Sequence, residues 1–242
     1  MENELWLTKI FNDHLAGIAN SLLSLAKQPT EPRPWSNWMV MELLVIAIMV
    51  VLFGMLRSKL SVDKPGKVQH LFEVIYLFVK DTAEEIGIHH GDRYIPYFGA
   101  LFIFILFMNL LGIIPTFESP TMYVAVPLGL AMATFIYYHY QGVRELGLLA
   151  YLKQFLGPIW YLFIIMIPLE IISHLARPLS LTVRLYANMF AGEQVTGAFL
   201  GLTKIGAPAI FMALHVFVAI LQAYIFMLLS MIYVNLATSR EH

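Results

Sequence analysis

Between Tyr94 and Val143, Glu118 is the only Asp, Glu, Lys or Arg. A membrane-spanning helix needs about 20 mostly apolar residues, and the chain on either side of Glu118 is long enough to supply one. The whole chain is 59% hydrophobic and only 13% charged, against about 25% charged residues in soluble domains. The sequence therefore predicts an all-α integral membrane protein.

The order of apolar and polar stretches divides the chain into five segments. They are an external amphipathic N-terminal segment (1–35), a first transmembrane helix (36–57), a cytoplasmic surface helix with loops (58–93), a transmembrane hairpin (94–143), and a tilted two-helix ion-conducting hairpin with the C-terminus (144–242). The last segment holds two apolar regions that exceed an upright crossing, so both helices must be long and strongly tilted. In the third segment, apolar residues recur with helical periodicity opposite a polar face, as in helices that lie on a membrane surface.

About five crossings follow, with the two termini on opposite sides of the membrane. Basic residues favour cytoplasmic loops, and most of those outside the apolar stretches lie in 57–93 and 144–153. This pattern predicts an external N-terminus and a cytoplasmic C-terminus. A rival topology breaks the fourth apolar region at Arg177–Pro178 and has six crossings.

A line of polar residues runs along that fourth apolar region. Its members step by three or four residues, so they share one helical face: Glu170, Ser173, Arg177, Ser180, Arg184 and Asn188. An arginine near mid-bilayer disfavours insertion by about 2.5–3.5 kcal/mol, and such residues usually mark ion paths or buried ion pairs. No carboxylate lies near Arg184 on its own face, so its partner must come from another helix or another subunit.

The other members of the line leave alternatives open. Arg177 lies near the cytoplasmic end and is expected to reach the interface as an anchor. Glu170 and Ser173 either line a water-accessible path from the cytoplasmic side or lie at the membrane interface. Ser180 either joins that path or hydrogen-bonds to its own helix backbone.

Two ionisable residues lie near the expected turn of the last hairpin. Glu193 and His215 come to comparable depth near the outer side if the two helices pair. Both side chains can exchange protons near neutral pH after modest shifts, although His215 alone could be a satisfied helix–helix contact. Gln222 lies on the face of His215 and nearer Arg184, to which it could hydrogen-bond. Asn109 either bonds across helices or faces the same cavity.

Several function classes are excluded or disfavoured. The chain has no cysteine, and no sequence pattern indicates a metal site, a cofactor or nucleotide hydrolysis by the chain itself. The net charge of −1 gives no reason to expect nucleic-acid binding. Two classes stay open: an ion-conducting subunit whose carboxylate partner is another protein, and a secondary transporter or ion channel with Arg184 as the substrate or anion site. The second predicts internal repeats, which the sequence lacks.

Four stretches of the sequence resemble one known family. "RPLSLTVRLYANMFAGE" (177–193) closely resembles the fourth-crossing motif of subunit a of F-type ATP synthases, bacterial type. The stretches "DKPGKVQHLFEVIYLFV" (63–79), "NLLGIIP" (109–115) and "LQAYIFMLLSMIYV" (221–234) are similar to other blocks of the same family, in the same order. The resemblance covers nearly the whole chain from about Trp35 onward.

The resemblance implies a proton-conducting stator beside a rotating ring of subunit c in a bacterial inner membrane. The arginine matching Arg184 faces the ring carboxylate and separates two half-channels. Residues matching Glu193, His215, Asn188 and Gln222 belong to the outer path, to which we add Asn109. Those matching Glu170 and Ser173 belong to the cytoplasmic path, to which we add Ser180.

The resemblance also implies other partners and leaves one departure. Subunit b of the peripheral stalk and the lipid bilayer are expected neighbours, and H+ is favoured over Na+ as the ion. Some bacterial members carry an Asp where this chain has Gly112. Glu118 or Glu42 could line the outer entrance in its place.

Overall fold

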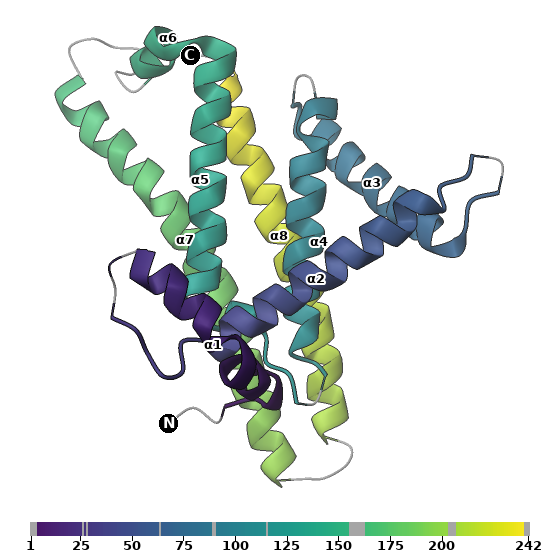
Figure 1. Cartoon of the computed structure of the whole chain (residues 1–242). Coiled ribbons are helices and arrows are strands. Elements are labelled where there is room, and N and C mark those ends of the chain that lie inside the picture. Colours follow the sequence, from purple (N-terminus) through teal and green to yellow (C-terminus); the bar gives the residue numbers. More distant parts are fainter. Residues whose placement is uncertain are drawn as a thin grey trace.

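The computed structural model describes residues 4–25, 27, 29–62, 64–88, 91–114, 116–154, 163–202 and 207–239. These residues form eight α-helices and two short 3-10 turns, and no strand lies among them. In order (Figure 1) they are α1 (Trp6–Leu25), α2 (Asn37–Ser58), α3 (Lys67–Glu85), η1 (Gly91–Arg93), α4 (Ile95–Leu111), η2 (Pro120–Met122), α5 (Ala125–Leu146), α6 (Leu148–Gln154), α7 (Phe163–Leu202) and α8 (Ala207–Thr238). The all-helical fold class is confirmed.

The packed centre consists of α4, α5, α7 and α8. Helix α8 contacts the other three, and α5 also contacts α7. Ala219 and Ala223 on α8 are fully buried, because small side chains let neighbouring helix backbones approach closely. Met227 and Met231 continue the same buried face toward the C-terminus. The helices that carry the predicted functional residues are therefore the core of the fold.

Helix α7 is continuous over 40 residues and contains Pro168 and Pro178. Proline removes one backbone donor from a helix, and membrane helices tolerate this where nearby side chains satisfy the freed carbonyl groups. Helix α7 nevertheless runs unbroken through both prolines. The rival topology with a break at Arg177–Pro178 is therefore wrong.

Helices α7 and α8 are longer than one upright crossing. They have 40 and 32 residues, which at about 1.5 Å per residue exceeds a hydrocarbon core of about 30 Å. The two helices descend toward the same end of the molecule and pack along each other (Figure 1). Two long helices that pack along each other are thus present; the turn predicted between them falls largely on residues 203–206, outside the described residues, and their tilt in the membrane stays a prediction.

Helices α1, α2 and α3 lie outside this centre. Helix α2 slants away from the four core helices (Figure 1) and exposes much of its apolar surface. Among the described residues, two helices are long and apolar enough to cross a membrane, α2 with 22 residues and 30 residues of α8 (Ala209–Thr238), while apolar α4 is shorter at 17 residues. Five crossings and their tilt remain a prediction.

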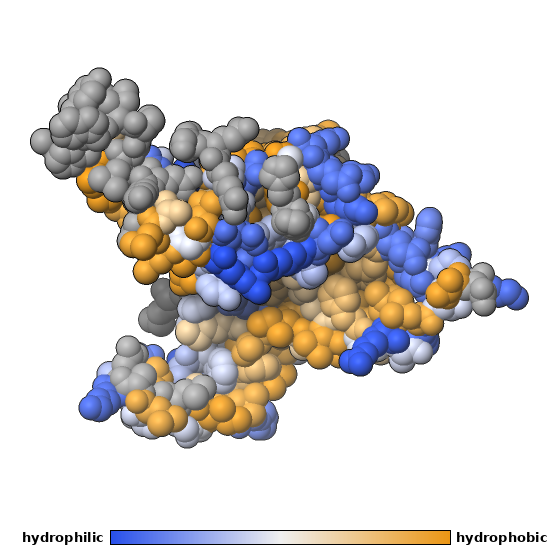
Figure 2. Space-filling view, turned by 90° about the horizontal axis from the view of Figure 1, so that it is seen from above, coloured by the Kyte–Doolittle hydropathy of each residue, from blue (hydrophilic) through white to orange (hydrophobic). Residues whose placement is uncertain are grey.

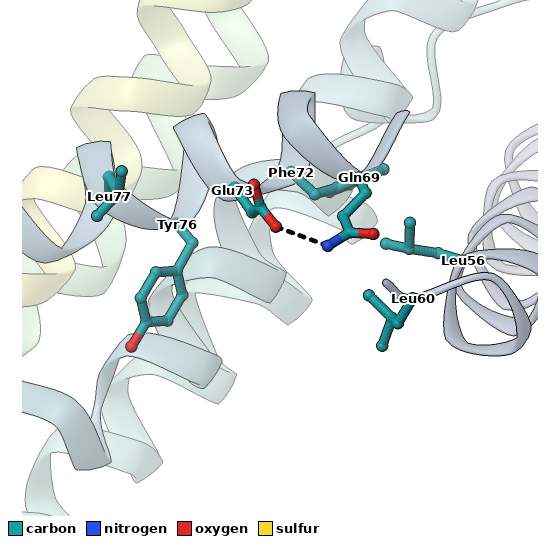
Figure 3. A pocket seen from close by; sticks show the side chains of 7 residues that line it. All are labelled: Leu56, Leu60, Gln69, Phe72, Glu73, Tyr76 and Leu77. Atoms are coloured by element: carbon teal, nitrogen blue, oxygen red, sulfur yellow. Dashed lines mark hydrogen bonds between the residues drawn. The ribbon is translucent and has the colours of Figure 1, made fainter. Parts of the chain in front are cut away.

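Helix α3 has the predicted amphipathic character. Its inward side buries Val79, Thr82 and Ala83, and Phe72 contacts Phe53 of α2 with ring centroids 5.1 Å apart. A shallow, mainly apolar groove separates the ends of the two helices (Figure 3). It is lined by Leu56, Leu60, Gln69, Phe72, Glu73, Tyr76 and Leu77.

Two connecting elements were not predicted. Gly147 ends α5 with a positive φ of 83°, a backbone conformation that glycine adopts without strain, and the seven-residue α6 follows it. On the opposite side, η2 lies in the link between α4 and α5 and contacts α7. Seen from the end that carries α6, polar residues gather over the middle of the molecule and apolar residues occupy its flanks (Figure 2).

Candidate functional site

Arg184 lies on the outward side of α7. The inward side of this helix consists of Leu181, Leu185 and Met189, each at most 2% exposed. Arg184 itself is exposed and lies beside Val183, which is 52% exposed. In the described part of the chain, Arg184 forms no ion pair or hydrogen bond. Helix α7 thus presents one cation on an apolar outer surface.

The residues of the predicted polar line are exposed to different degrees along one face of α7. Ser173 and Ser180 are exposed like Arg184, whereas Glu170 and Arg177 are only partly exposed. The guanidinium carbon of Arg177 lies 5.8 Å from the ring centroid of Tyr138 and 5.3 Å from that of Tyr233. Arg177 therefore packs against tyrosines of α5 and α8, in cation–π geometry, rather than acting only as the expected interfacial anchor.

His215 of α8 contacts the backbone of α7 next to Glu193. The His215 ring hydrogen-bonds to the backbone of Gly192, the residue before Glu193. The Nε2 atom of His215 and the Oε2 atom of Glu193 are both buried, and neither has a hydrogen-bond partner in the described ranges. Buried polar atoms in native proteins bind a protein group or water. Both atoms are thus suited to bind water or exchange protons.

Asn109 belongs to a buried hydrogen-bond network that joins α4, η2 and α8. Its Nδ2 atom donates to the carbonyl oxygen of Ala219 (3.2 Å), and its Oδ1 atom accepts from the Thr121 hydroxyl (2.7 Å). The Ser119 hydroxyl contacts Thr121 (2.7 Å) and donates to the carbonyl oxygen of Met108 (3.1 Å). Of the two readings offered by the sequence, bonding across helices is the one observed.

This network brings Glu118 next to Glu193. The backbone of Ser119 hydrogen-bonds to the Glu193 carboxylate, and Glu118 lies close enough to Glu193 for electrostatic interaction. Glu118 accepts hydrogen bonds from Tyr123 (2.8 Å) and from Asn37 of α2 (3.3 Å). The sequence offered Glu118 only as one of two carboxylates for the outer side, and it missed Ser119 and Thr121.

Asn188 and Gln222 take intermediate positions between these groups and Arg184. Asn188 follows Arg184 by one helical turn on α7 and is partly exposed. Gln222 on α8 is 8% exposed, and among the described residues no hydrogen bond joins it to Arg184. The hydrogen bond to Arg184 that the sequence left open for Gln222 is thus not among those formed by the described residues.

A second polar group lies at the other end of α7. His174 is in contact with Glu170 on the same helix, with a distance of 3.2 Å between His174 Nε2 and Glu170 Oε1. Its Nδ1 atom lies 2.8 Å from the Tyr138 hydroxyl. Glu170 was predicted from the sequence as part of an ion path and His174 was not, although the spacing of four residues places both on one helical face.

The fold and these groups define a class of protein. Helix α8, which is long and apolar enough to cross a membrane, carries the buried His215, and the neighbouring α7 carries Glu193 with a buried Oε2 atom and the exposed Arg184. Within the described ranges, no three His, Asp or Glu side chains gather as a metal site would require. The arrangement is that of a helical membrane protein with ionisable side chains where its helices pack.

Comparison with known proteins identifies the family. Residues 39–235 match the family described as ATP synthase A chain. The chain is 56% identical over 233 residues to ATP synthase subunit a of Solibacter usitatus, covering 96% of this chain and 100% of that protein. It is 46% identical over 244 residues to ATP synthase subunit a of Koribacter versatilis, covering 100% of both, and 41% identical to that of Bdellovibrio bacteriovorus over 71% of this chain and 75% of that protein.

The chain belongs to the ATP synthase subunit a family. It is therefore a membrane protein and the proton-translocating subunit of the Fo sector, and it serves ATP synthesis without being a catalytic subunit.

Proposed function

We propose that this chain is a stator that conducts protons to a rotating ring of subunit c through two offset half-channels, with Arg184 between them. The observation that carries this proposal is the exposure of Arg184 on an apolar face of α7 without a partner in the described part of the chain. A cation in that environment is costly unless it is paired. A carboxylate presented by a neighbouring subunit would complete the pair.

Arg184 acts as a fixed charge in this proposal. A guanidinium cannot be deprotonated in a protein, so it cannot pass protons from one half-channel to the other. It favours the ionised form of the ring carboxylate that faces it, because an opposite charge nearby stabilises ionisation. A carboxylate that has taken up a proton must then travel round the ring before releasing it.

The outer half-channel consists of Glu193 and His215, with Asn109, Asn188 and Gln222 between them and Arg184. The buried and unpartnered Oε2 and Nε2 atoms support this role for the first two. Glu118 is the carboxylate that takes the place of the residue matching Gly112. Its proximity to Glu193 favours it over Glu42.

The cytoplasmic half-channel comprises Glu170, Ser173 and Ser180. Glu170 has a side chain 37% exposed, and both serines face the same outward side as Arg184. The two groups of residues lie toward opposite ends of α7, with Arg184 between them in the sequence. This separation supports two half-channels that do not meet within the chain.

The segments identified from the sequence complete the proposal. We place the chain in a bacterial inner membrane with five crossings, an external N-terminus and a cytoplasmic C-terminus. The same side of the molecule carries α3, α6 and the C-terminus, and α1 lies toward the other side (Figure 1), which supports this orientation. Subunit b of the peripheral stalk, the c ring and lipid would cover the exposed apolar faces.

The energy for rotation comes from the membrane potential. One elementary charge that crosses 100 mV releases about 2.3 kcal/mol.

The test is substitution of Arg184 in the complete complex. Arg184→Ala should abolish proton-coupled ATP synthesis in membrane vesicles while the complex still assembles with its ring. Arg57→Ala, which removes an exposed arginine at the end of α2, is the matched control and should retain synthesis. Retained synthesis in Arg184→Ala would contradict the proposal. Purification of the chain alone, with transport activity and no ring, would favour the transporter alternative.

The outer pair has its own test. If Glu193 and His215 exchange protons with each other, a variant with the two residues exchanged should keep more activity than either single alanine variant. An exchanged variant as inactive as His215→Ala would show that the pair does not act together.

A further inference from the structure

Seven polar and aromatic side chains meet where α5, α6, α7 and α8 come together, on the side that carries α6 in Figure 1. We call them the tyrosine–histidine cluster: Tyr138 and His139 of α5, Tyr151 of α6, Glu170, His174 and Arg177 of α7, and Tyr233 of α8. Sequence analysis selected Glu170 alone as part of an ion path. The other members explain how a proton could reach it.

His174 is the central member, because both of its ring nitrogens have partners. Its Nε2 atom lies 3.2 Å from the Glu170 carboxylate, and its Nδ1 atom lies 2.8 Å from the Tyr138 hydroxyl. The His174 side chain is only 11% exposed, whereas that of Glu170 is 37% exposed. The contacts therefore lead from the buried Tyr138, through His174, to a carboxylate that reaches solvent.

The direction of each hydrogen bond follows from the chemistry of the groups. An ionised carboxylate only accepts hydrogen bonds, so the Nε2–H group of His174 donates to Glu170. In a neutral imidazole the other nitrogen is then an acceptor, and the Tyr138 hydroxyl donates to Nδ1. This arrangement is that of a proton shuttle, which takes up a proton on one nitrogen and releases one from the other.

We propose that His174 is a proton-relay residue of the cytoplasmic half-channel, passing protons toward Glu170; this inference rests on the proposed function. In the relay step the Tyr138 hydroxyl gives its proton to Nδ1 of His174, and Nε2 gives its proton to the Glu170 carboxylate. The Tyr138 oxygen then takes up a proton released from the subunit c ring, and Glu170 loses its proton to water. Uptake of one proton from water on Nε2 and loss of one to water from Nδ1 restore the starting tautomer of His174.

The charges around His174 suit this step. Arg177 lies against the Tyr138 ring with its guanidinium carbon 5.8 Å from the ring centroid, so its positive charge stabilises the phenolate that forms briefly. Tyr233 of α8 holds Arg177 from the other side.

His139 is close to His174 but has another role. The two rings are 5.0 Å apart, and the Nδ1 atom of His139 lies 2.5 Å from the Tyr151 hydroxyl. Burial raises the pKa of Tyr151 to about 12, so this phenol stays protonated at neutral pH and donates the bond. His139 thus connects α5 to α6, and it makes no contact with Glu170 within the described residues.

The experiment measures passive proton conduction through Fo in inverted membrane vesicles from which the catalytic sector has been removed. His174→Ala and His174→Gln should each lower conduction about tenfold or more, given that positioned acid–base groups contribute roughly 10²–10⁴-fold to proton transfer. Added imidazole should restore conduction in His174→Ala. Pyrazole, a similar ring that is too weak a base, should not restore it.

The matched control is His139→Gln, which keeps an acceptor for Tyr151 in the same cluster and should conduct like the unmodified protein. Wild-type conduction in His174→Gln, or loss in His174→Ala that imidazole does not restore, would overturn the relay and leave His174 a structural residue. If His174→Ala fails to assemble, His174→Gln and Tyr138→Phe decide the question, since both must conduct poorly. If the His174 variants contradict the relay while Arg184→Ala is inactive, the relay is wrong and the proposed function stands.

Discussion

Gly192 on α7 lies against the imidazole ring of His215 on α8. A Cβ atom on Gly192 would lie 3.1 Å from Nδ1 and 3.3 Å from Cε1 of that ring. His215 hydrogen-bonds to the Gly192 backbone, so its Nδ1 atom is used for positioning, while Nε2 has no partner among the described residues. The glycine therefore sets the position of the ring from which the proposed outer path exchanges protons.

Gly192→Ala should disturb proton transfer more than assembly. The new methyl group must push the His215 ring by a few tenths of an ångström, and misplacement of a reacting group by 1 Å can cost about 10²-fold. We expect passive proton conduction to fall about tenfold in Gly192→Ala, and further in Gly192→Val. Conduction in vesicles with a normal content of Fo is the measurement.

Gly197 on the same helix supplies the control. Nothing lies within 4 Å of a Cβ atom built there, and alanine favours a helix over glycine by about 0.8–1 kcal/mol. Gly197→Ala should therefore assemble and conduct normally. Equal losses in the two variants would mean that any added methyl group on α7 is harmful and that contact with His215 is not the cause.

The functional residues that the sequence reveals differ in their chemistry and surroundings from those that it does not. Arg184, Glu193 and His215 are detectable because an ionisable group in a long apolar stretch is costly and therefore conspicuous. Ser119 and Thr121 are not conspicuous, since hydroxyl residues are common in turns. Their contact with Asn109 depends on how the link between α4 and α5 folds back, which no local pattern specifies.

The long helices were predictable because their apolar stretches stand out in the sequence. The short connecting elements have no such signal. The apolar stretches that form α2, α4, α5, α7 and α8 are read directly from composition. Helix α6 has seven residues, too few for hydrophobic periodicity to indicate a helix. Gly147, a typical residue after a helix C-terminus, was an available signal for the end of α5. His174 was also available by its spacing from Glu170, but its contact with Tyr138 depends on the packing of α5 against α7.

Gly112 is another position where a side chain would be harmful. A Cβ atom there would lie 2.8 Å from Cβ and 3.0 Å from the backbone nitrogen of Ser119. Because a backbone cannot move aside as a flexible side chain can, Gly112→Ala should destabilise the fold by about 1–3 kcal/mol. Gly112→Asp should be worse, since Ser119 fills the space that the larger side chain would need.

The measurement is the thermal unfolding of the complex in detergent. Gly99→Ala on the same helix is the control, because nothing lies within 4 Å of a Cβ atom built at Gly99. Gly112→Ala should unfold at a lower temperature than Gly99→Ala. Unchanged unfolding of Gly112→Ala would show that the segment around Ser119 can move away without cost.

Asn109 should contribute strongly to the packing of α4 against α8. Its side chain is fully buried, and Asn109→Leu would leave the carbonyl oxygen of Ala219 and the hydroxyl of Thr121 without their present partner. Each unsatisfied buried polar group costs about 1–3 kcal/mol. Asn235→Leu removes one hydrogen bond, to the carbonyl oxygen of Ile86, from a partly buried asparagine of α8 and should cost less. The order of the two unfolding temperatures is the test, and the reverse order would contradict it.

Tyr151 makes the attachment of α6 sensitive to alkaline pH. Burial raises the pKa of its phenol to about 12, whereas an exposed tyrosine has a pKa of about 10. A raised pKa means that the docked state binds the proton more tightly, so docking is fully present below about pH 10 and is lost as the pH rises towards 12.

The sequence has no cysteine, so a single spin label can be attached at Leu149→Cys, a position 78% exposed on α6. In the otherwise unmodified chain the label should become more mobile between about pH 10 and pH 12. With Tyr151→Phe it should be more mobile already at pH 8 and show no such transition, while Tyr140→Phe, at an exposed position of α5, should behave like the unmodified chain. Identical mobility curves with and without the Tyr151 hydroxyl would exclude its hydrogen bond to His139 as the attachment of α6.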